Sequence, residues 1–276
     1  MKKLENFKCI AVIGAGTMGS GIAQVAASAG YHTLLYDEAK DAAARGWEMI
    51  KKNLAIAISK NKISQGKEEK ILSQIKVIDE FSELKADVII EAIIEKLEIK
   101  TELFRRLEAI NDNDTILCSN TSSIPITQIA ASMQHPERLV GMHFFNPAHL
   151  MKLVEIVSGE RTSKENAQTI FALAKKFDKE PVMVKDSPGF IVNRIGKLYH
   201  TEPLKILGEK IATVETIDAL LEATGFKMGP FKLIDLIGVD ANLNVTKSLY
   251  ELFNHHPKFE PSDIQQQLVD SGSNLG

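Results

Sequence analysis

The stretch that decides the fold is Cys9-Ile-Ala-Val-Ile-Gly-Ala-Gly-Thr-Met-Gly-Ser-Gly-Ile-Ala23. An apolar run typical of a buried strand leads into Gly14, Gly16 and Gly19, which have the spacing G-x-G-x-x-G. The first glycine allows a tight turn, the second lets a ligand approach the backbone, and the third lets the next helix pack against the strand. The start of that helix offers N–H groups and partial positive charge to phosphates. We therefore predict a pyrophosphate-binding loop made of Gly14, Ala15, Gly16, Thr17, Met18 and Gly19.

An acidic residue ends the next apolar run, Thr33-Leu-Leu-Tyr-Asp37. A carboxylate at this place can bind both hydroxyls of a ribose but would repel a 2′-phosphate. Asp37 therefore predicts NAD, and not NADP, as the cofactor. The alternative is a glycine turn that binds nothing, and the strand before it, the helix after it and Asp37 together argue against that alternative.

Apolar runs of strand type alternate with helical patterns through the first two thirds of the chain. The helical patterns include Gly19–Ala29 and Lys96–Ile110. The strand runs lie at Cys9–Ile13, Thr33–Tyr36, Asp87–Glu91, Thr115–Ser119 and Leu139–Phe145. This alternation predicts an α/β fold, in which residues 1–186 form a Rossmann-type domain with a parallel sheet.

Two further regions have helical patterns only. Residues 42–75 are rich in lysine, and their apolar residues recur at helical spacing, so we predict a helical hairpin that projects from the sheet, with its turn near Asn61–Gly66. After Asp186-Ser187-Pro188-Gly189 the strand signals nearly vanish. Residues 187–276 are therefore predicted to form a smaller all-α domain.

Composition argues against several classes of protein. The net charge is −3, with 25% charged residues, so bulk electrostatic binding to nucleic acid or to a membrane surface is not expected. No stretch approaches the roughly 20 apolar residues of a membrane span. The two cysteines, Cys9 and Cys118, lie in strand runs, which fits reduced thiols and predicts a cytoplasmic protein. No cluster has metal-ligand spacing, so no metal is expected.

Two later segments, Leu139–Pro147 and Lys152–Val157, predict the chemistry. If they pair as an antiparallel ribbon about a loop centred near His149, His143 and Glu155 lie opposite each other, with Cβ atoms about 4.5–5.5 Å apart. A carboxylate beside an imidazole fixes its tautomer and favours the imidazolium, which suits a general base that accepts a hydroxyl proton. Because the register is assumed, the alternative is that both residues merely share a sheet edge.

Several motifs follow one another in a specific order. They are Gly-Ala-Gly-Thr-Met-Gly-Ser-Gly-Ile-Ala (14–23), Ser-Asn-Thr-Ser-Ser (119–123), Gly-Met-His-Phe-Phe-Asn-Pro (141–147), Met-Lys-Leu-Val-Glu (151–155), Asp-Ser-Pro-Gly-Phe-Ile-Val-Asn-Arg (186–194), Met-Gly-Pro-Phe (228–231) and Asp-Leu-Ile-Gly (235–238). Together they resemble the 3-hydroxyacyl-CoA dehydrogenases over essentially the whole chain. The resemblance implies NAD-dependent oxidation of a (3S)-3-hydroxyacyl-CoA to a 3-oxoacyl-CoA, with an acyl-CoA as the partner molecule and a homodimer as the assembly.

The resemblance also implies a role for each matching residue. His143 is expected to be the base and Glu155 its orienting partner, while Ser122 and Asn193 hydrogen-bond the substrate's oxygens and the imidazole. Around NAD, the glycine loop and Asp37 are expected to be joined by Glu95, Lys100 and Asn146. In the hairpin, Asn53 and Lys60 match positions that contact coenzyme A, and the other lysines are expected to form a solvated face.

The C-terminal half carries a finer likeness. Residues 223–231, 240–248 and 259–269 are similar to the 3-hydroxyadipyl-CoA dehydrogenases of phenylacetate breakdown, whose acyl chain ends in a carboxylate. Lys197 is a candidate counter-ion for that carboxylate. The 3-hydroxybutyryl-CoA dehydrogenases share the catalytic motifs and remain an alternative. A dehydrogenase of free β-hydroxyacids and a non-catalytic NAD-binding protein are further alternatives. The family normally continues beyond the Leu-Gly at which this sequence stops, with a basic tail that contributes a lysine near NAD.

Overall fold

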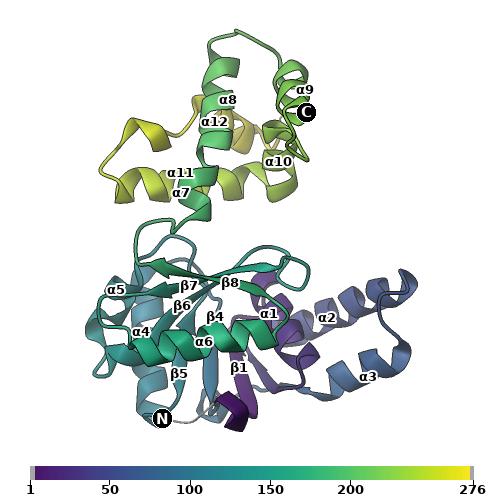
Figure 1. The fold of residues 1–276 in the computed structure, drawn as a ribbon, viewed down its shortest axis with the longest axis vertical. Helices are drawn as coiled ribbons and strands as arrows, with labels where there is room; N and C mark the ends of the chain where they lie inside the picture. The colour runs from purple at the N-terminus through teal and green to yellow at the C-terminus, as the bar shows by residue number, and fades with distance from the viewer. Residues whose placement is uncertain (1–3, 274–276) are drawn as a thin grey trace. The chain divides into compact units, whose positions relative to one another are not determined.

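The computed structural model describes residues 4–273. The chain divides into two compact units, Met1–Asp186 and Ser187–Gly276. The first unit contains an eight-stranded, mostly parallel sheet with helices packed against it, and the second is helical (Figure 1). The predicted fold class is therefore confirmed. The Leu-Gly at the end of the sequence, to which the expectation about the family's basic tail refers, lies outside the described residues.

The sheet of the first unit has one reversal of strand direction. Its spatial order is β3-β2-β1-β4-β5-β6-β7-β8, and every neighbouring pair is parallel except β6 and β7. Because parallel strands end at the same edge, the carboxyl ends of β1, β4, β5 and β6 lie side by side, which is where α/β sheets bind ligands. The strands are β1 Cys9–Ile13, β2 His32–Tyr36, β3 Ile75–Val77, β4 Val88–Glu91, β5 Ile116–Ser119, β6 Leu139–Phe144, β7 Leu153–Ser158 and β8 Glu180–Lys185.

Helices connect these strands and supply the other half of the core. Their bounds are η1 Leu4–Asn6, α1 Thr17–Ser28, α2 Ala42–Ser59, α3 Gln65–Ser73, η2 Phe81–Glu83, α4 Leu97–Ile110, α5 Ile126–Ile129, η3 Ala130–Ser132, η4 Pro136–Arg138 and α6 Lys164–Lys176. Ser64 and Ser163 begin α3 and α6, since each side chain accepts a hydrogen bond from a main-chain N–H in the first turn.

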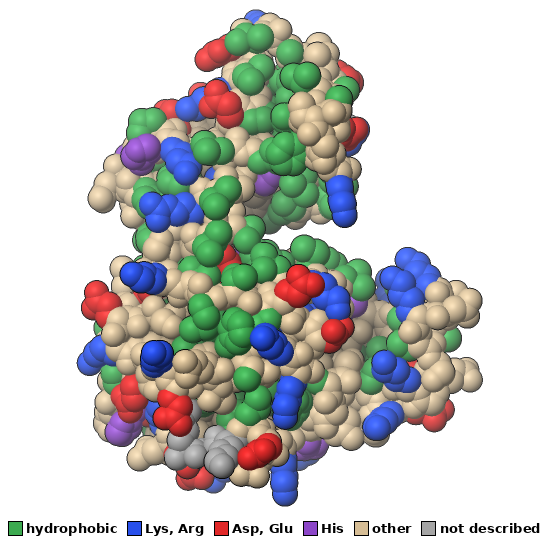
Figure 2. All heavy atoms as spheres, viewed as in Figure 1, with side chains coloured by type: hydrophobic (Ala, Val, Ile, Leu, Met, Phe, Trp, Pro, Cys, Tyr) green, Lys and Arg blue, Asp and Glu red, His purple; other side chains and the backbone are tan. Residues whose placement is uncertain are grey.

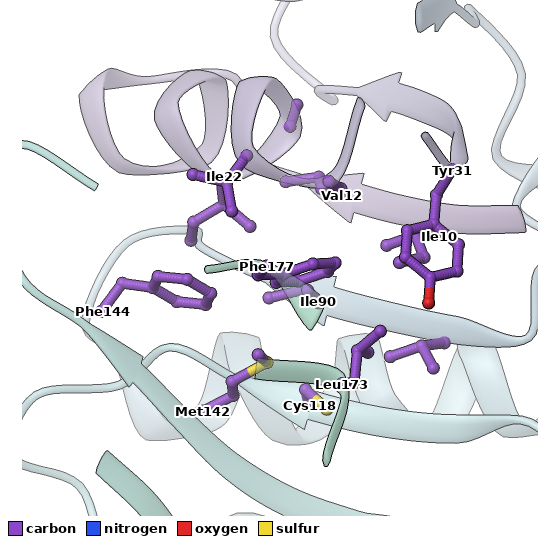
Figure 3. Packing of buried hydrophobic residues seen from close by; sticks show 14 of the residues in the cluster. Ile10, Val12, Ile22, Tyr31, Ile90, Cys118, Met142, Phe144, Leu173 and Phe177 are labelled. Atoms are coloured by element: carbon purple, nitrogen blue, oxygen red, sulfur yellow. The ribbon is translucent and has the colours of Figure 1, made fainter. Parts of the chain in front are cut away.

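The core of the first unit joins the central strands to α1 and α6. Figure 3 shows Val12 and Ile90 of the sheet beside Ile22 of α1 and Leu173 of α6, all buried. The strand runs are apolar at nearly every position because helices bury both faces of a parallel sheet. Cys118 lies in the same cluster, and burial raises the pKa of its thiol.

Helices α2 and α3 form a hairpin. They run from Ala42 to Ser59 and from Gln65 to Ser73, and the turn between them covers residues 60–64. The hairpin is fixed to the rest of the unit by Ile50, Leu54 and Ile71, which are buried in the core. Figure 2 shows Lys and Arg side chains gathered at its surface.

The second unit has a small core of its own, which contains Leu204, Ile217, Phe231, Ile234 and Val239. Its helices are α7 Val192–Gly196, α8 Leu198–Gly208, α9 Val214–Ala223, α10 Pro230–Ile237, α11 Val239–Leu252, η5 Pro257–Phe259 and α12 Asp263–Ser271. In neither unit does any described helix combine the length and apolar character needed to cross a membrane.

Candidate active site

The glycine turn begins where β1 ends and is held in shape by main-chain contacts. Gly14 has φ +91° and donates its N–H to the Tyr36 carbonyl at 2.9 Å. A Cβ on Gly14 would lie 2.5 Å from the Ala92 oxygen, and a Cβ on Gly19 would lie 1.6 Å from the Gly14 oxygen. Nothing lies within 4 Å of the place where a Cβ on Gly16 would stand. The first and third glycines therefore close the turn, and the second leaves it open to a ligand.

Asp37 follows β2 and is bonded to the glycine turn. Its carboxylate accepts the N–H of Ala15 at 2.7 Å through Oδ2 and that of Ala39 at 2.9 Å through Oδ1. Together with Gly14, Gly16, Thr17 and Met18, it lines a cleft of about 820 Å³. The same cleft has a wall that the sequence did not predict, formed by Ala92, Ile93, Ile94, Ile99, Leu103 and Arg106.

The ribbon of β6 and β7 has the predicted register. His143 and Glu155 are Cα partners across the two antiparallel strands, and His143 Nδ1 lies 2.7 Å from Glu155 Oε2. Their side chains are only 4% and 0% exposed. An ionised carboxylate can only accept a hydrogen bond, so this contact places a proton on Nδ1. With that proton on Nδ1, the lone pair of His143 lies on Nε2, the ring nitrogen that faces Ser122.

Ser122 completes the other side of the imidazole. Its Oγ lies 3.1 Å from His143 Nε2, and it belongs to the turn at residues 121–123 that follows β5. A hydroxyl at this place can share a hydrogen bond with the base and with a substrate oxygen. The structure thus brings together Ser122, His143 and Glu155, three of the four predicted catalytic residues.

Glu95 holds the turn that carries Ser122. Its Oε1 accepts the hydroxyl of Thr121 at 2.7 Å and the N–H groups of Ser122 and Ser123 at 2.8 and 3.0 Å. Burial acts to raise the pKa of Glu95, but the charge of Lys100 and the bonds from Thr121 and Ser122 outweigh it, so this pKa lies below its ordinary value. Glu95 is therefore ionised at neutral pH.

Lys100 links Glu95 to a carboxylate that the sequence did not single out. Its Nζ contacts Glu95 Oε2 at 3.2 Å and also forms an ion pair with Glu91, the last residue of β4. Glu91 and Lys100 are both fully buried. A signal existed, because Glu91 is the one charged residue of an otherwise apolar strand.

Comparison with known proteins identifies the family. Residues 9–187 match the family model described as 3-hydroxyacyl-CoA dehydrogenase, NAD binding domain, and residues 189–275 match the one described as 3-hydroxyacyl-CoA dehydrogenase, C-terminal domain. The chain belongs to the 3-hydroxyacyl-CoA dehydrogenase family. Its cofactor is accordingly NAD, as the glycine turn and Asp37 predict, since the match over residues 9–187 is to an NAD-binding domain.

Individual relatives of this dehydrogenase bear different substrate names. It is 45% identical over 269 residues to 3-hydroxyadipyl-CoA dehydrogenase of Escherichia coli (strain K12), an alignment that covers 97% of this chain and 57% of that relative. It is 40% identical over 267 residues to the probable 3-hydroxybutyryl-CoA dehydrogenase of Bacillus subtilis (strain 168), covering 96% and 93%. The crystal structure of (S)-3-hydroxybutyryl-CoA dehydrogenase from Ralstonia eutropha matches with a TM-score of 0.91 at 36% identity, covering 97% and 95%.

The other residues implied by the family resemblance lie on several different elements. Asn146 is exposed on the loop after β6, where it precedes Pro147 through a cis peptide bond. Asn53 donates to Gln24 Oε1 at 3.3 Å in the middle of α2, and Lys60 is exposed at the end of that helix. Asn193 lies on α7 of the second unit. Their contacts with ligands remain predictions.

Lys197 is buried within the second unit. Its Nζ donates to the carbonyl oxygen of Asn242 at 2.9 Å and to the side-chain oxygen of the same residue at 3.1 Å. Burial lowers the pKa of Lys197 to about 7. The ammonium is thus directed at Asn242 inside the helical unit, which does not support the predicted role as a counter-ion that receives a substrate carboxylate.

Proposed function

We propose that this dehydrogenase oxidises the 3-hydroxyl of a (3S)-3-hydroxyacyl-CoA reversibly to the 3-oxoacyl-CoA. One observation carries the proposal: His143 has Glu155 on one ring nitrogen and Ser122 on the other, at the sheet edge where the glycine turn also lies. When bound, NAD supplies the acceptor for the hydride that leaves C3. The cleft beside Gly16 and Asp37 fits such a dinucleotide, because it combines open backbone at the turn with a carboxylate at the end of β2.

The protein's own residues handle the proton. His143 Nε2 removes the proton of the 3-hydroxyl, and the Glu155 carboxylate stabilises the imidazolium that results. Ser122 Oγ, at 3.1 Å from Nε2, orients the substrate oxygen against the base. Proton transfer by a positioned base contributes about 10²–10⁴-fold to a rate. In the reverse direction, the same imidazolium returns the proton to the 3-oxo oxygen.

Within this reaction we propose an acyl chain that ends in a carboxylate, as in 3-hydroxyadipyl-CoA. Support comes from the three C-terminal segments similar to that subfamily and from the name of the E. coli relative. The B. subtilis relative favours 3-hydroxybutyryl-CoA as the alternative. Values of kcat/KM for the two substrates, measured with NAD on the wild-type chain, decide between them.

We also propose a cytoplasmic homodimer that associates through the second unit. Support for the dimer comes from large apolar side chains that this unit leaves exposed, such as Ile211 at 69% and Leu236 at 70%. Figure 2 shows hydrophobic side chains at the surface of this unit. Burying such surface against a second copy would be favourable. Support for a reducing compartment comes from the buried thiol of Cys118.

The test is the variant His143→Gln, assayed with NADH and acetoacetyl-CoA. We expect kcat to fall by about 10²–10⁴-fold, since the base is lost, while the Kd for NADH stays unchanged. His135→Gln is the matched control, because His135 also pairs with a glutamate, Glu137, at 3.2 Å but lies outside the site. Full activity of His143→Gln would refute the proposal, and a wild-type chain that binds NADH without turnover would favour the non-catalytic alternative.

A further inference from the structure

Glu91 is a buried carboxylate that no part of the proposed reaction uses. It stands at the carboxyl end of β4, between the glycine turn after β1 and the serine turn after β5. Three donors surround it: the Ile93 N–H at 2.8 Å and the Lys100 ammonium, both on Oε1, and the Ser119 hydroxyl at 2.6 Å on Oε2. Each carboxylate oxygen therefore has at least one donor.

Burying such an ion pair costs free energy unless hydrogen bonds satisfy all of its polar atoms. Removing a carboxylate and an ammonium from water costs several kcal/mol per ion, and the attraction between them recovers this only with good geometry and additional hydrogen bonds. An apolar pair of similar volume at the end of β4 would fill the same space without that cost. The pair does not stand alone, however, because both members continue into the turn that carries Ser122.

Two routes lead from Glu91 to that turn. By the first, Lys100 Nζ contacts Glu95 Oε2 at 3.2 Å, and the other oxygen of Glu95 accepts the N–H groups of Ser122 and Ser123. By the second, the Ser119 hydroxyl donates to Glu91 and accepts the N–H of Thr121 at 3.2 Å. The main chain on both sides of Ser122 is thus tied to one carboxylate.

We propose that Glu91 is a positioning residue of the active site, which acts through Lys100, Glu95 and Ser119 to hold Ser122 against the imidazole of His143. The proposal rests on the proposed function, because it assigns Ser122 a part in turnover. Glu91 is fully buried, and its carboxylate accepts hydrogen bonds from Ile93, Lys100 and Ser119, so it acts through other residues. Its negative charge is what matters, since it orients both the ammonium and the serine hydroxyl as donors.

The test is Glu91→Gln, which keeps the size of the side chain but leaves one acceptor oxygen for three donors. We expect kcat to fall by about 10- to 100-fold, the loss typical of a reacting group displaced by a fraction of an ångström to an ångström. In a Ser122→Ala background the same substitution should cost less than about 3-fold, because residues that act as one unit have non-additive effects. Equal losses in both backgrounds would overturn the proposal.

A matched control lies on the same helix as Lys100. Glu108 accepts two main-chain N–H groups, from Gln134 at 2.9 Å and His135 at 2.6 Å, and it is not among the residues that line the cleft. Glu108→Gln should leave kcat within about 2-fold of wild type. A loss in this variant as large as that in Glu91→Gln would mean that any carboxylate that anchors main-chain N–H groups has the same effect, and would overturn the proposal.

A readout that needs no turnover separates this proposal from the proposed function. The ¹⁵N resonances of the His143 ring, assigned by their disappearance in His143→Gln, should shift in Glu91→Gln and coincide with wild type in Glu108→Gln. An inactive wild-type chain would refute the proposed function alone, whereas unshifted His143 resonances in Glu91→Gln would refute the positioning role alone. Should Glu91→Gln fail to fold, Ser119→Ala removes the second route only and should shift the same resonances by a smaller amount.

Discussion

A single imidazole carries the proposed chemistry because its two nitrogens meet partners of different kinds. Glu155 accepts from Nδ1 inside the sheet, and Ser122 stands at Nε2 toward the edge. The contact with Glu155 was predictable, since opposed positions on paired strands follow from counting residues. The contact with Ser122 was predictable only through the family resemblance, because nothing local relates residue 122 to residue 143. The part played by Glu91 was not predicted at all, since it depends on which side chains tertiary packing brings around one carboxylate.

Asp37 offers a prediction at the same scale. In Asp37→Ala the ribose hydroxyls lose an ionised acceptor and Ala15 loses its partner, so we expect the KM for NAD to rise by about 10- to 100-fold. The KM for NADP should change less, because repulsion of its 2′-phosphate is removed at the same time. Steady-state rates with both cofactors measure this. Asp79→Ala, on an exposed loop, is the control, and an unchanged ratio of NAD to NADP use would contradict the assignment.

At the scale of elements, the strand patterns succeeded where the strands are central. The runs ending at Ile13, Glu91 and Ser119 correspond closely to β1, β4 and β5. By contrast, β3 and β8 were not predicted. Strand β3 has only three residues. Strand β8 lies at the edge of the sheet, has a proline at its second position, and leaves Val182 and Met183 partly exposed. Apolar periodicity is weakest at sheet edges, because an edge strand is less completely covered.

Two glycines of the turn between β1 and α1 allow the stability of the fold and the binding of NADH to be tested separately. In Gly19→Ala the new Cβ would meet the Gly14 oxygen at 1.6 Å, so we expect a loss of roughly 2 kcal/mol or more in the free energy of unfolding, together with weaker NADH binding. In Gly16→Ala the new Cβ would have no neighbouring atom within 4 Å. That variant should bind NADH less tightly while its free energy of unfolding changes by less than about 1 kcal/mol.

Urea unfolding and NADH fluorescence titration measure the two quantities. Gly66→Ala is the control, because the space around that residue on α3 is open and it lies outside the cleft. Tight NADH binding by Gly16→Ala would show that the pyrophosphate does not approach the turn there.

For the whole molecule, the sequence predicted two units of different class, and the chain does divide at Asp186. What patterns could not predict is the polar interior of the second unit. Asn242 accepts from Lys197 and Gln265 and contacts His200 Nδ1 at 2.9 Å, although all four residues have polar side chains typical of surfaces. Their burial follows from the packing of α8, α11 and α12, which no local signal encodes.

Lys197 gives this unit a predicted pH dependence. Its pKa in the folded chain is lowered by burial to about 7, from an ordinary value of 10.5. Below pH 7 the ammonium is present in folded and unfolded chains alike, so the free energy of unfolding does not depend on pH through this group. Between pH 7 and 10.5 the unfolded chain binds a proton that the folded chain does not, and the free energy of unfolding rises with pH.

In Lys197→Met this rise in the free energy of unfolding with pH should vanish. In the wild-type chain it is worth up to a few kcal/mol, at about 1.4 kcal/mol for each pH unit. Urea unfolding followed by circular dichroism at neutral and alkaline pH measures the difference. Lys227→Met, an exposed residue of the same unit, should behave as wild type. Identical pH profiles for wild type and Lys197→Met would contradict the prediction.

The buried thiol in the centre of the sheet has a practical consequence. The sequence holds two cysteines, and Cys118 lies inside the core with a raised pKa, so its reactive thiolate hardly forms. Maleimide reagents should therefore modify Cys9, which is half-buried at the amino end of β1, at the opposite edge from the imidazole. A fluorophore attached there would give a single-label reporter of ligand binding without any engineered substitution.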